Sequence, residues 1–476
     1  MKKVSILSLV FALSILFIFS TGFACTTILI GKKATLDGAV IHAHNEDMGF
    51  NSVGRLWPVQ AETHKKNETL KVPYAQIPQP KKTLQYWASG NAFGSTGLGV
   101  AAESRPYDAV LVGMNEAGVT MSCNWTYSKE ENYPGQGIRR YAIRQLILER
   151  SQTARDAVKL IADFIEQYGQ ADWGGLDYCL ADQNEAWVVE TTSKHWVAKR
   201  VKDNEILAVA NWFVIGEEYD LASKDLIDYA VSKGWYSAKK DGKFNFRNAY
   251  GQSDRKNNAY DIDRENRAYE LLKNKKGVIT PEDLFFVLMD RYEGTSKFRK
   301  PLSEIEHWEN ITDNLLIPRP IGTNLCQSSS VAHLRSDLPV EIGAVMWFAM
   351  ATPGYSDYFP VYAGADTIPT EFQNVSSSYS PNSAWWTFRL LQKIADTDYD
   401  FLYPRLRTSW EANHGSILVH QKTAEAKAKA LFDAGKKKEG VDLISRFTSS
   451  QAQSALQHAR LMLHNVQQLT GNISVW

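Results

Sequence analysis

Cys25 follows a segment with the pattern of an export signal, and this position could make it a catalytic nucleophile. The segment holds two lysines, an apolar run over residues 6–19, and small residues at Gly22 and Ala24. This pattern is typical of a signal peptide that is cut after Ala24. The cut would leave Cys25 with a free α-amine, whose ordinary pKa of about 7.7–8.0 lets it act as a general base toward its own thiol.

Other interpretations of this segment stay open. The apolar run could be a membrane anchor, but it is shorter than the ~20 residues that a spanning helix needs. Cys25 could carry the lipid of a lipoprotein, although Gly22 and Phe23 depart from that signal, or it could be an ordinary buried cysteine. Whether a signal peptidase or the protein itself makes the cut is also open.

Composition excludes several classes of function. Lys+Arg and Asp+Glu both number 53, so no net charge attracts nucleic acid. Four cysteines in 476 residues are too few for a disulfide framework, and if Cys25 stays free at least one more is unpaired. No cysteine–histidine spacing fits zinc, and His42 and His44 lie two apart, as along one face of a strand. We therefore predict no metal and no other cofactor, and no nucleic acid partner.

Residues 26–31 are β-branched and predict a strand. The turn dipeptide Asp37-Gly38 follows, and residues 39–44 predict the returning strand. Such a hairpin would place Asn45 and Asp47 opposite Cys25, within a few residues of register.

The rest of the chain predicts an α+β fold with helices packed on sheets. Thr153 and Asp156 form a capping box, and Thr280 precedes a proline and two acids, so both positions predict helix starts. Residues 232–270 are polar and predict a surface excursion. We expect strands over 108–114, 119–123, 176–181, 185–191, 196–201, 206–210, 328–335 and 344–351, and helices over 139–150, 153–168 and from 383 onward.

Motifs spread over some 340 residues resemble those of one family. Cys25-Thr26-Thr27 followed by His44-Asn45-Glu46-Asp47 is similar to the opening of the dipeptidase A-type cysteine peptidases, which are N-terminal nucleophile hydrolases related to the secernins. Further similar segments are 113–119, 181–187, 210–213, 330–339 and 347–362.

The resemblance implies a four-layer αββα sandwich and hydrolysis of dipeptides. More distant relatives, the penicillin V acylases and bile salt hydrolases, cleave other amides with the same arrangement. In those relatives an arginine stands where this chain has His44. This departure argues against simply transferring acylase specificity to the chain.

The resemblance also suggests roles for individual residues. Cys25 would attack the scissile carbonyl, and Asp47 would hold or orient the α-amine unless it is only a strand-end carboxylate. Asn124 and Asn211 would lie near the developing oxyanion, or would simply be turn residues at strand ends.

Two further residues are candidates for binding. Asn45 would position the N-terminus and the substrate there, or close the hairpin. Arg335 could pair with a substrate carboxylate, which suits its forked guanidinium, or could form a structural ion pair.

These observations predict an exported cysteine dipeptidase that acts on small peptides. Residues 1–24 would be the leader, 25–382 the hydrolase domain and 383–476 a helical region packed on it. We expect a periplasmic or extracellular protein without stable membrane insertion after the leader is removed; a homo-oligomer is possible. The alternatives are an N-acyl amide hydrolase and a catalytically silent secernin-like or lipid-anchored binding protein.

Overall fold

The computed structural model describes residues 25–48, 52–91, 109–131, 135–252, 259–301 and 318–471. The predicted leader and its cleavage site after Ala24 lie outside these residues, so both stay predictions. Cys25 is the first residue that the structure describes.

The predicted N-terminal hairpin is confirmed. β1 (Thr26–Ile30) and β2 (Val40–Asp47) pair antiparallel, with Thr26 opposite Asn45. Gly38 supports the turn with a φ of 77°, a conformation that costs glycine little. Every side chain of both strands is buried, so the hairpin lies inside the molecule and carries its polar residues with it.

β1 and β2 belong to a six-stranded antiparallel sheet of strand order β12-β1-β2-β14-β15-β16. β14 pairs with β2 although almost 300 residues separate them, and it places Cys326 opposite Asp47. Both strand regions that the sequence predicted after residue 320 are confirmed here. The added strands are β12 (Ile206–Val209), β14 (Cys326–Leu334), β15 (Ala344–Met350) and β16 (Phe359–Tyr362).

The second large sheet has eight strands in the order β13-β11-β10-β9-β8-β7-β6-β3. Its central strands β8, β9 and β10 face β1 and β2 of the first sheet. The strands are β3 (Gly54–Val59), β6 (Tyr86–Asn91), β7 (Val110–Asn115), β8 (Thr120–Thr126), β9 (Gly175–Ala181), β10 (Ala186–Thr191), β11 (Trp196–Arg200) and β13 (Leu221–Ala222), and a separate ribbon holds β4 (Thr69–Val72) and β5 (Ala75–Pro78).

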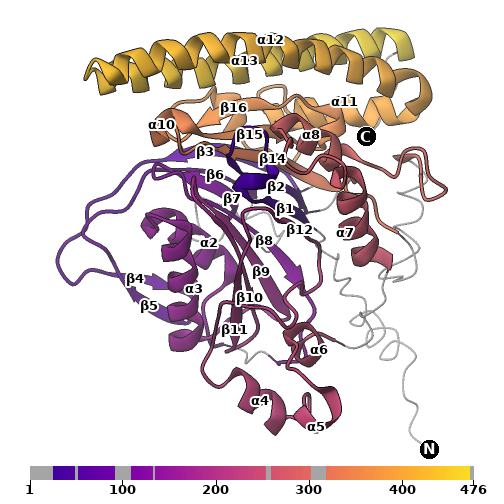
Figure 1. The fold of residues 1–476 in the computed structure, drawn as a ribbon. Coiled ribbons are helices and arrows are strands. Elements are labelled where there is room, and N and C mark those ends of the chain that lie inside the picture. The colour runs from indigo at the N-terminus through magenta and orange to yellow at the C-terminus, as the bar shows by residue number, and fades with distance from the viewer. Residues whose placement is uncertain are drawn as a thin grey trace, which may run out of the picture.

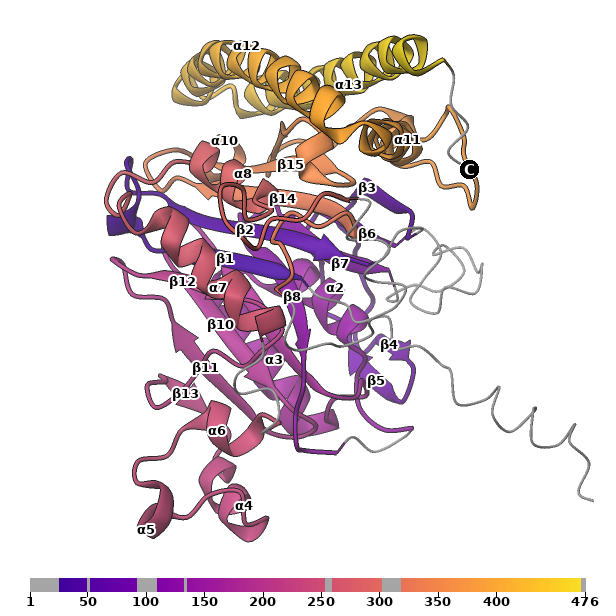
Figure 2. The same cartoon turned by 90° about the vertical axis from the view of Figure 1, so that its right-hand side faces the viewer.

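Helices cover the outer face of each sheet, which gives the predicted four-layer αββα sandwich (Figures 1 and 2). α2 (Arg140–Arg150) and α3 (Ala154–Tyr168) lie on the eight-stranded sheet, and α3 begins at the predicted Thr153–Asp156 capping box. α7 (Ala259–Leu272), α8 (Pro281–Met289) and the short α10 (Val340–Gly343) lie on the six-stranded sheet.

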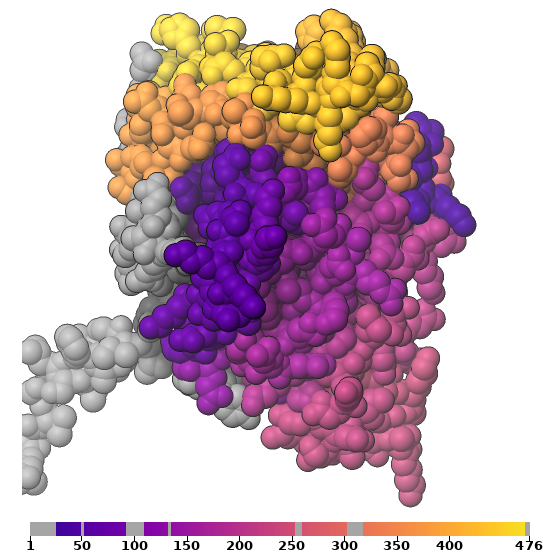
Figure 3. All heavy atoms as spheres, turned by 90° about the vertical axis from the view of Figure 1, so that its left-hand side faces the viewer, coloured from indigo at the N-terminus to yellow at the C-terminus, as the bar shows by residue number. Residues whose placement is uncertain are grey.

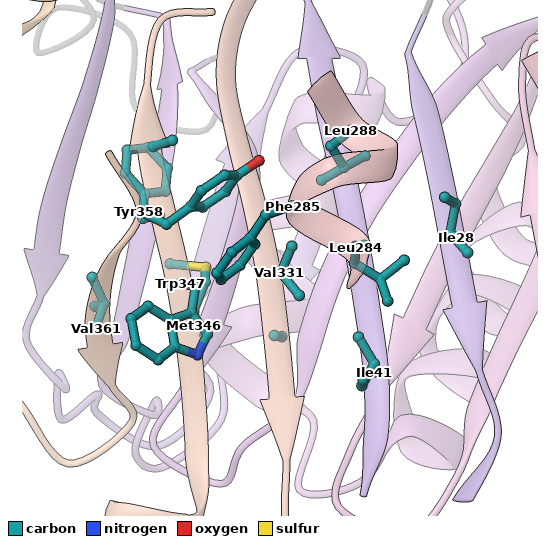
Figure 4. Close-up of a cluster of buried hydrophobic side chains, with 14 of the residues drawn as sticks. Ile28, Ile41, Leu284, Phe285, Leu288, Val331, Met346, Trp347, Tyr358 and Val361 are labelled. Atoms are coloured by element: carbon teal, nitrogen blue, oxygen red, sulfur yellow. The ribbon is translucent and has the colours of Figure 1, made fainter. Parts of the chain in front are cut away.

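α8 is fixed to its sheet by an apolar cluster (Figure 4). Leu284, Phe285 and Leu288 are buried among side chains of the strands below, such as Ile41. Phe285 also stacks on Tyr358, with ring centroids 4.1 Å apart. Burial of one such side chain contributes about 1.5–3 kcal/mol, so the end of α8 is a firm support for the hairpin beneath it.

The prediction of a surface excursion over 232–270 is wrong in its second half. α5 (Ala238–Asp241) is exposed, but α6 (Phe246–Tyr250) and α7 bury residues, as does α4 (Leu226–Ser232) before them. Arg264 and Asp261 of α7 are both fully buried and form an ion pair with an N–O distance of 2.8 Å. A charged sequence is buried here because its charges meet partners inside the protein.

The C-terminal region is helical, as predicted. It consists of α11 (Ala384–Thr397), α12 (Tyr399–Asp433) and α13 (Lys437–Thr470), and α11 and α13 contact strands β15 and β16. Figure 3 shows these helices, in orange and yellow, as a layer across one end of the molecule. The division into domains at residue 383 stays a prediction. In the part of the chain that the structure describes, no helix has the length and apolar character that a membrane crossing requires.

Candidate functional site

Cys25 lies immediately before β1, between the two sheets, with only 2% of its surface exposed. Its Sγ atom donates to Oε1 of Glu46 at 3.3 Å. Its carbonyl oxygen accepts from Nη1 of Arg264 at 2.7 Å and from Nδ2 of Asn124 at 3.3 Å. Groups from three different elements therefore fix both the backbone and the thiol of this residue.

The surroundings hold the thiol in its neutral form. Burial raises the pKa of Cys25 well above its ordinary value, and the carboxylates of Glu46 and Asp47 raise it further. A thiolate is the reactive form of cysteine. A nucleophilic Cys25 therefore needs a base that takes its proton as it attacks.

His44 and Glu46 form a buried pair beside the thiol. Alternation along β2 places both side chains on the face that Cys25 occupies, and His44 Nε2 lies 3.1 Å from Glu46 Oε2. Burial opposes ionisation of Glu46, but the His44 ring and Arg144 outweigh it and lower the pKa of this carboxyl. Glu46 is therefore a carboxylate that touches the thiol with one oxygen and the imidazole with the other.

A chain of hydrogen bonds places a proton on Nδ1 of His44. Nδ2 of Asn124 faces carbonyl oxygens, including that of Val209 at 2.9 Å, so its Oδ1 must be the atom that faces Thr27. Thr27 Oγ1 donates to this oxygen at 2.9 Å and consequently accepts from His44 Nδ1 at 2.8 Å. The proton on Nδ1 leaves Nε2 as the nitrogen that faces Glu46 and the thiol.

Asp47 lies on the opposite face of β2 from Glu46, next to the backbone of Cys25. Burial raises the pKa of Asp47 to about 7, against the opposing effect of Arg319, whose Nη2 is 3.2 Å from Oδ2. Arg264 and the Cys326 thiol also lower the pKa of this carboxyl, and the Glu46 carboxylate raises it. The register pairs Thr26 with Asn45, so Asp47 lies two residues beyond that pair, at the end of β2. The role of Asp47 beside the N-terminus of the mature chain stays a prediction.

Asn124 and Asn211 both lie near Cys25 but differ in what they do. The two hydrogens of Asn124 Nδ2 serve the carbonyl oxygens of Cys25, Val209 and Ala210, so this amide ties β8 to β1 and β12. The Asn211 amide is held by Arg264, which donates to Oδ1 at 2.8 Å. Asn124 therefore helps to position the backbone of Cys25, and the guanidinium of Arg264 sets the orientation of the Asn211 amide.

Asn45 holds the hairpin against the helical layer. Its Nδ2 donates to the carbonyl oxygens of Leu288, at the end of α8, and Ile321, at 2.8 and 2.9 Å. These contacts tie β2 to α8 and to residue 321, and none of them reaches the Cys25 thiol. The role of Asn45 in binding stays a prediction.

The substrate-binding role of Arg335 is corrected. β14 runs from Cys326, beside Asp47, to Leu334, so Arg335 lies beyond the far end of this strand. Its two terminal nitrogens pair with the two oxygens of Glu425 at 2.8 and 2.7 Å. Arg335 therefore forms the structural ion pair that was the alternative, and it links the sheet to α12.

Sequence reasoning missed three residues of the site: Glu46, Arg264 and Arg319. Glu46 had a signal, because it is two residues from His44 on a predicted strand and so shares its face. Arg264 lies within 232–270, the segment for which the sequence predicts a surface excursion. Arg319 follows a stretch without a predicted element, so nothing marked either arginine as buried.

The donors around Cys25 are also capable of binding a metal. The ligand atoms of Cys25, His44 and Glu46 all lie within 4.8 Å of one another, and all three residues are buried. All four cysteines of the chain are free thiols. The absence of a required metal cofactor stays a prediction.

Comparison with known proteins identifies the family. A "Probable dipeptidase A" of Streptococcus pyogenes is 28% identical over 410 residues, covering 79% of this chain and 83% of the relative, and a "Probable dipeptidase B" of Lactococcus lactis is 25% identical over 422 residues, covering 82% and 85%. Among solved structures, a penicillin V acylase from Agrobacterium tumefaciens has a TM-score of 0.39 at 14% identity, covering 71% of this chain and 86% of the acylase. The model of peptidase family C69 matches residues 24–412, which confirms the resemblance in the motifs: the chain belongs to peptidase family C69.

Proposed function

We propose that this protein is an exported dipeptidase in which Cys25, freed at its α-amine by removal of residues 1–24, is the nucleophile. The observation that carries the proposal is the placement of Cys25 at the start of β1, where contacts from both sheets and α7 converge on it. Relatives that match about four fifths of the chain are named dipeptidases, which supports a small peptide as the substrate.

The proton of the thiol goes to the α-amine in this mechanism. The buried thiol has a raised pKa, so it attacks only as a base removes its proton. The α-amine is close to the thiol because both belong to Cys25. Sγ bonds to the scissile carbonyl carbon, and the ammonium then returns the proton to the leaving amine. Water, deprotonated by the same amine, hydrolyses the acyl-enzyme and restores the thiol.

Asp47 and Asn211 would stabilise the two charges that develop in this reaction, the ammonium and the oxyanion. Asp47 lies beside the backbone of Cys25 and would balance the charge of the ammonium as it forms. Asn211 is the candidate donor to the oxyanion; Arg264 donates to its Oδ1 and its Nδ2 donates to the Trp125 carbonyl at 2.6 Å, which together set the direction of the amide. A donor aimed at a developing oxyanion contributes about 2.7–4 kcal/mol to transition-state stabilisation.

The test begins with the purified mature protein. Intact-mass measurement should give a chain that begins at Cys25 with an unmodified amine. This chain should hydrolyse members of a dipeptide panel faster than N-acyl amino acids or penicillin V. Cys25→Ser should lose at least about 10³-fold in kcat/KM, equivalent to about 4 kcal/mol, while its circular dichroism and melting temperature stay those of the wild type.

Several results would overturn the proposal. Full turnover by Cys25→Ser would refute the assignment of Cys25 as the nucleophile. Rapid turnover by a chain that retains residues 1–24, or that carries a lipid on Cys25, would refute the assignment of the α-amine as the base. Preference for N-acyl compounds would replace the substrate class and leave the nucleophile in place.

A further inference from the structure

The strand pair that carries Cys25 also assembles three groups of the kind that bind zinc. They are a thiol, an imidazole and a carboxylate, contributed by Cys25, His44 and Glu46. Zinc sites use this set of sulfur, nitrogen and oxygen ligands. The spacing of these residues in the sequence does not match a known zinc-binding motif. His44 and Glu46 are two residues apart on β2, and Cys25 comes close to them only because β1 pairs with β2 in the hairpin.

The ligand atoms lie close enough together to share one ion. With bonds of about 2.3 Å to sulfur and about 2.0–2.1 Å to nitrogen and oxygen, tetrahedral angles place sulfur about 3.5 Å from an oxygen ligand and nitrogen about 3.3 Å from it. Sγ of Cys25 lies 3.3 Å from Oε1 of Glu46, and Nε2 of His44 lies 3.1 Å from the other oxygen, Oε2, with the three ligand atoms within 4.8 Å of one another. Each of the other two ligands thus faces a different oxygen of Glu46, and rotation of the carboxylate would bring one oxygen toward both.

The groups behind His44 fit a ligand as well. A metal-binding imidazole usually donates its second N–H to a fixed acceptor, which sets the tautomer and the ring orientation. His44 Nδ1 donates to Thr27 Oγ1 at 2.8 Å, and the Asn124 amide in turn fixes Thr27. With Nδ1 committed to Thr27, Nε2 is the nitrogen through which His44 would bind the ion.

We propose that Cys25, His44 and Glu46 form a site for a zinc-class divalent cation, which holds the nucleophile as a metal thiolate and blocks the peptidase reaction while it is bound. Binding breaks the S–H bond of Cys25, releases one proton to solvent and forms the metal–sulfur bond. Thiolate and carboxylate together balance the two charges of the ion. In the mature chain of the proposed function, the α-amine of Cys25 can complete the tetrahedron.

Arg144 limits how tightly the ion binds. Its charge acts on Glu46, and its Nη2 donates to the carbonyl oxygen of Cys123 at 2.9 Å, so it stays beside the site. A nearby cation opposes a second one. We therefore expect a reversible inhibitor site that a chelator empties, and a folded protein without the metal.

Cobalt(II) is the probe, because it takes the same geometry as zinc and its thiolate complex absorbs. Titration of the purified protein should give one equivalent of a thiolate-to-cobalt charge-transfer band with tetrahedral visible bands, and zinc should displace it. Cys25→Ser should abolish the charge-transfer band, and His44→Gln and Glu46→Gln should each weaken cobalt binding at least about tenfold. His64→Gln is the matched control, since His64 also faces a glutamate, Glu68 at 3.0 Å, but at the surface and without a thiol.

A second measurement needs no variant. Zinc should slow alkylation of Cys25 in the wild-type protein, read by peptide mass spectrometry, and chelation should restore the rate. Absence of the charge-transfer band, or a band of unchanged affinity in both His44→Gln and Glu46→Gln, would overturn the site. These readouts do not depend on turnover, so a protein that fails to hydrolyse dipeptides but shows the band would refute the proposed function and leave the metal site standing.

Discussion

Arg264 is the residue on which the geometry around Cys25 depends most. One terminal nitrogen donates to the Cys25 carbonyl and to Thr26 Oγ1, and the other to Asn211 and Asp261. Its side chain is fully buried, so no water replaces a lost contact at its original place. A fork with several donors is needed here, and lysine offers a single point charge.

Arg264→Lys should therefore lower kcat/KM by at least about tenfold, or about 1.4 kcal/mol, mainly through kcat. The physical reason is that the Asn211 amide and the Cys25 backbone lose a shared support. Steady-state kinetics on a dipeptide measure the effect. Arg267→Lys is the matched control one turn along α7, because Arg267 pairs with Asp290 and touches neither residue. Equal losses in the two variants would mean that Arg264 acts only through stability.

A second residue-scale prediction concerns Glu265, also on α7. Burial raises the pKa of this carboxyl from 4.5 to about 8. The folded protein thus keeps a proton that the unfolded chain loses, so this contribution to stability is complete below pH 4.5 and is lost as the pH rises toward 8. Glu265→Gln should remove this loss, and relative to wild type the variant should gain up to about 3–5 kcal/mol between pH 5 and pH 8.

Urea unfolding at a series of pH values measures that difference. Glu270→Gln serves as the control on the same helix, because the Glu270 side chain is 56% exposed and should leave the pH slope unchanged. If Glu265→Gln retains the wild-type slope, Glu265 is ionised in the folded state and the assignment of its raised pKa is wrong.

At the scale of elements, the sequence predicted those helices, strands and turns that are determined by local sequence patterns. The first hairpin, the capping box of α3, the start of α8 after Thr280 and the central strands follow from alternation, turn residues and caps, and the structure confirms them. The prediction for the α7 segment was wrong because its sequence is charged, and charged residues are ordinarily exposed. Its burial depends on partners such as Asn211 and Asp290, which are distant in sequence, and a single sequence does not show these contacts.

Arg335 is a second residue whose partner the sequence does not show: it was a candidate for binding substrate, but it pairs with Glu425. The prediction at the scale of elements concerns this ion pair. Glu425 of α12 accepts from both of its terminal nitrogens and also from Tyr362 at 2.7 Å. Arg335→Ala should cost about 3 kcal/mol of stability, since removal of one partner leaves a largely buried charge behind. Its kcat and KM should match those of the wild type, because the residue is remote from Cys25.

Chemical unfolding and kinetics together decide the role of Arg335. The double variant with Glu425→Ala should lose less stability than the sum of the two single variants, as coupled partners do. A raised KM for dipeptides with unchanged stability would return Arg335 to the substrate-binding role that the sequence allowed.

At the scale of the whole molecule, the C-terminal helices support the site as well as covering a sheet. Arg389 of α11 is fully buried and donates to the carbonyl oxygen of Asn324 at 2.7 Å. Asp396, on the same helix, accepts from the Asn324 side chain at 3.0 Å. Asn324 precedes Cys326, which pairs with Asp47 in the sheet. α11 thus holds the strand that lies beside the Cys25 site.

A chain that ends at residue 382 should therefore fail to give a stable enzyme, although the sequence predicted a domain boundary there. Removal of α11–α13 would expose the apolar faces of β15 and β16 and would release Asn324 from Arg389 and Asp396. Expression of this chain beside the full-length protein, with size-exclusion chromatography, thermal melting and dipeptide hydrolysis, measures the outcome. We expect aggregated or unfolded protein without activity. A soluble, cooperatively melting and active product would show instead that the hydrolase domain is complete at 382 and that the helices are an accessory layer.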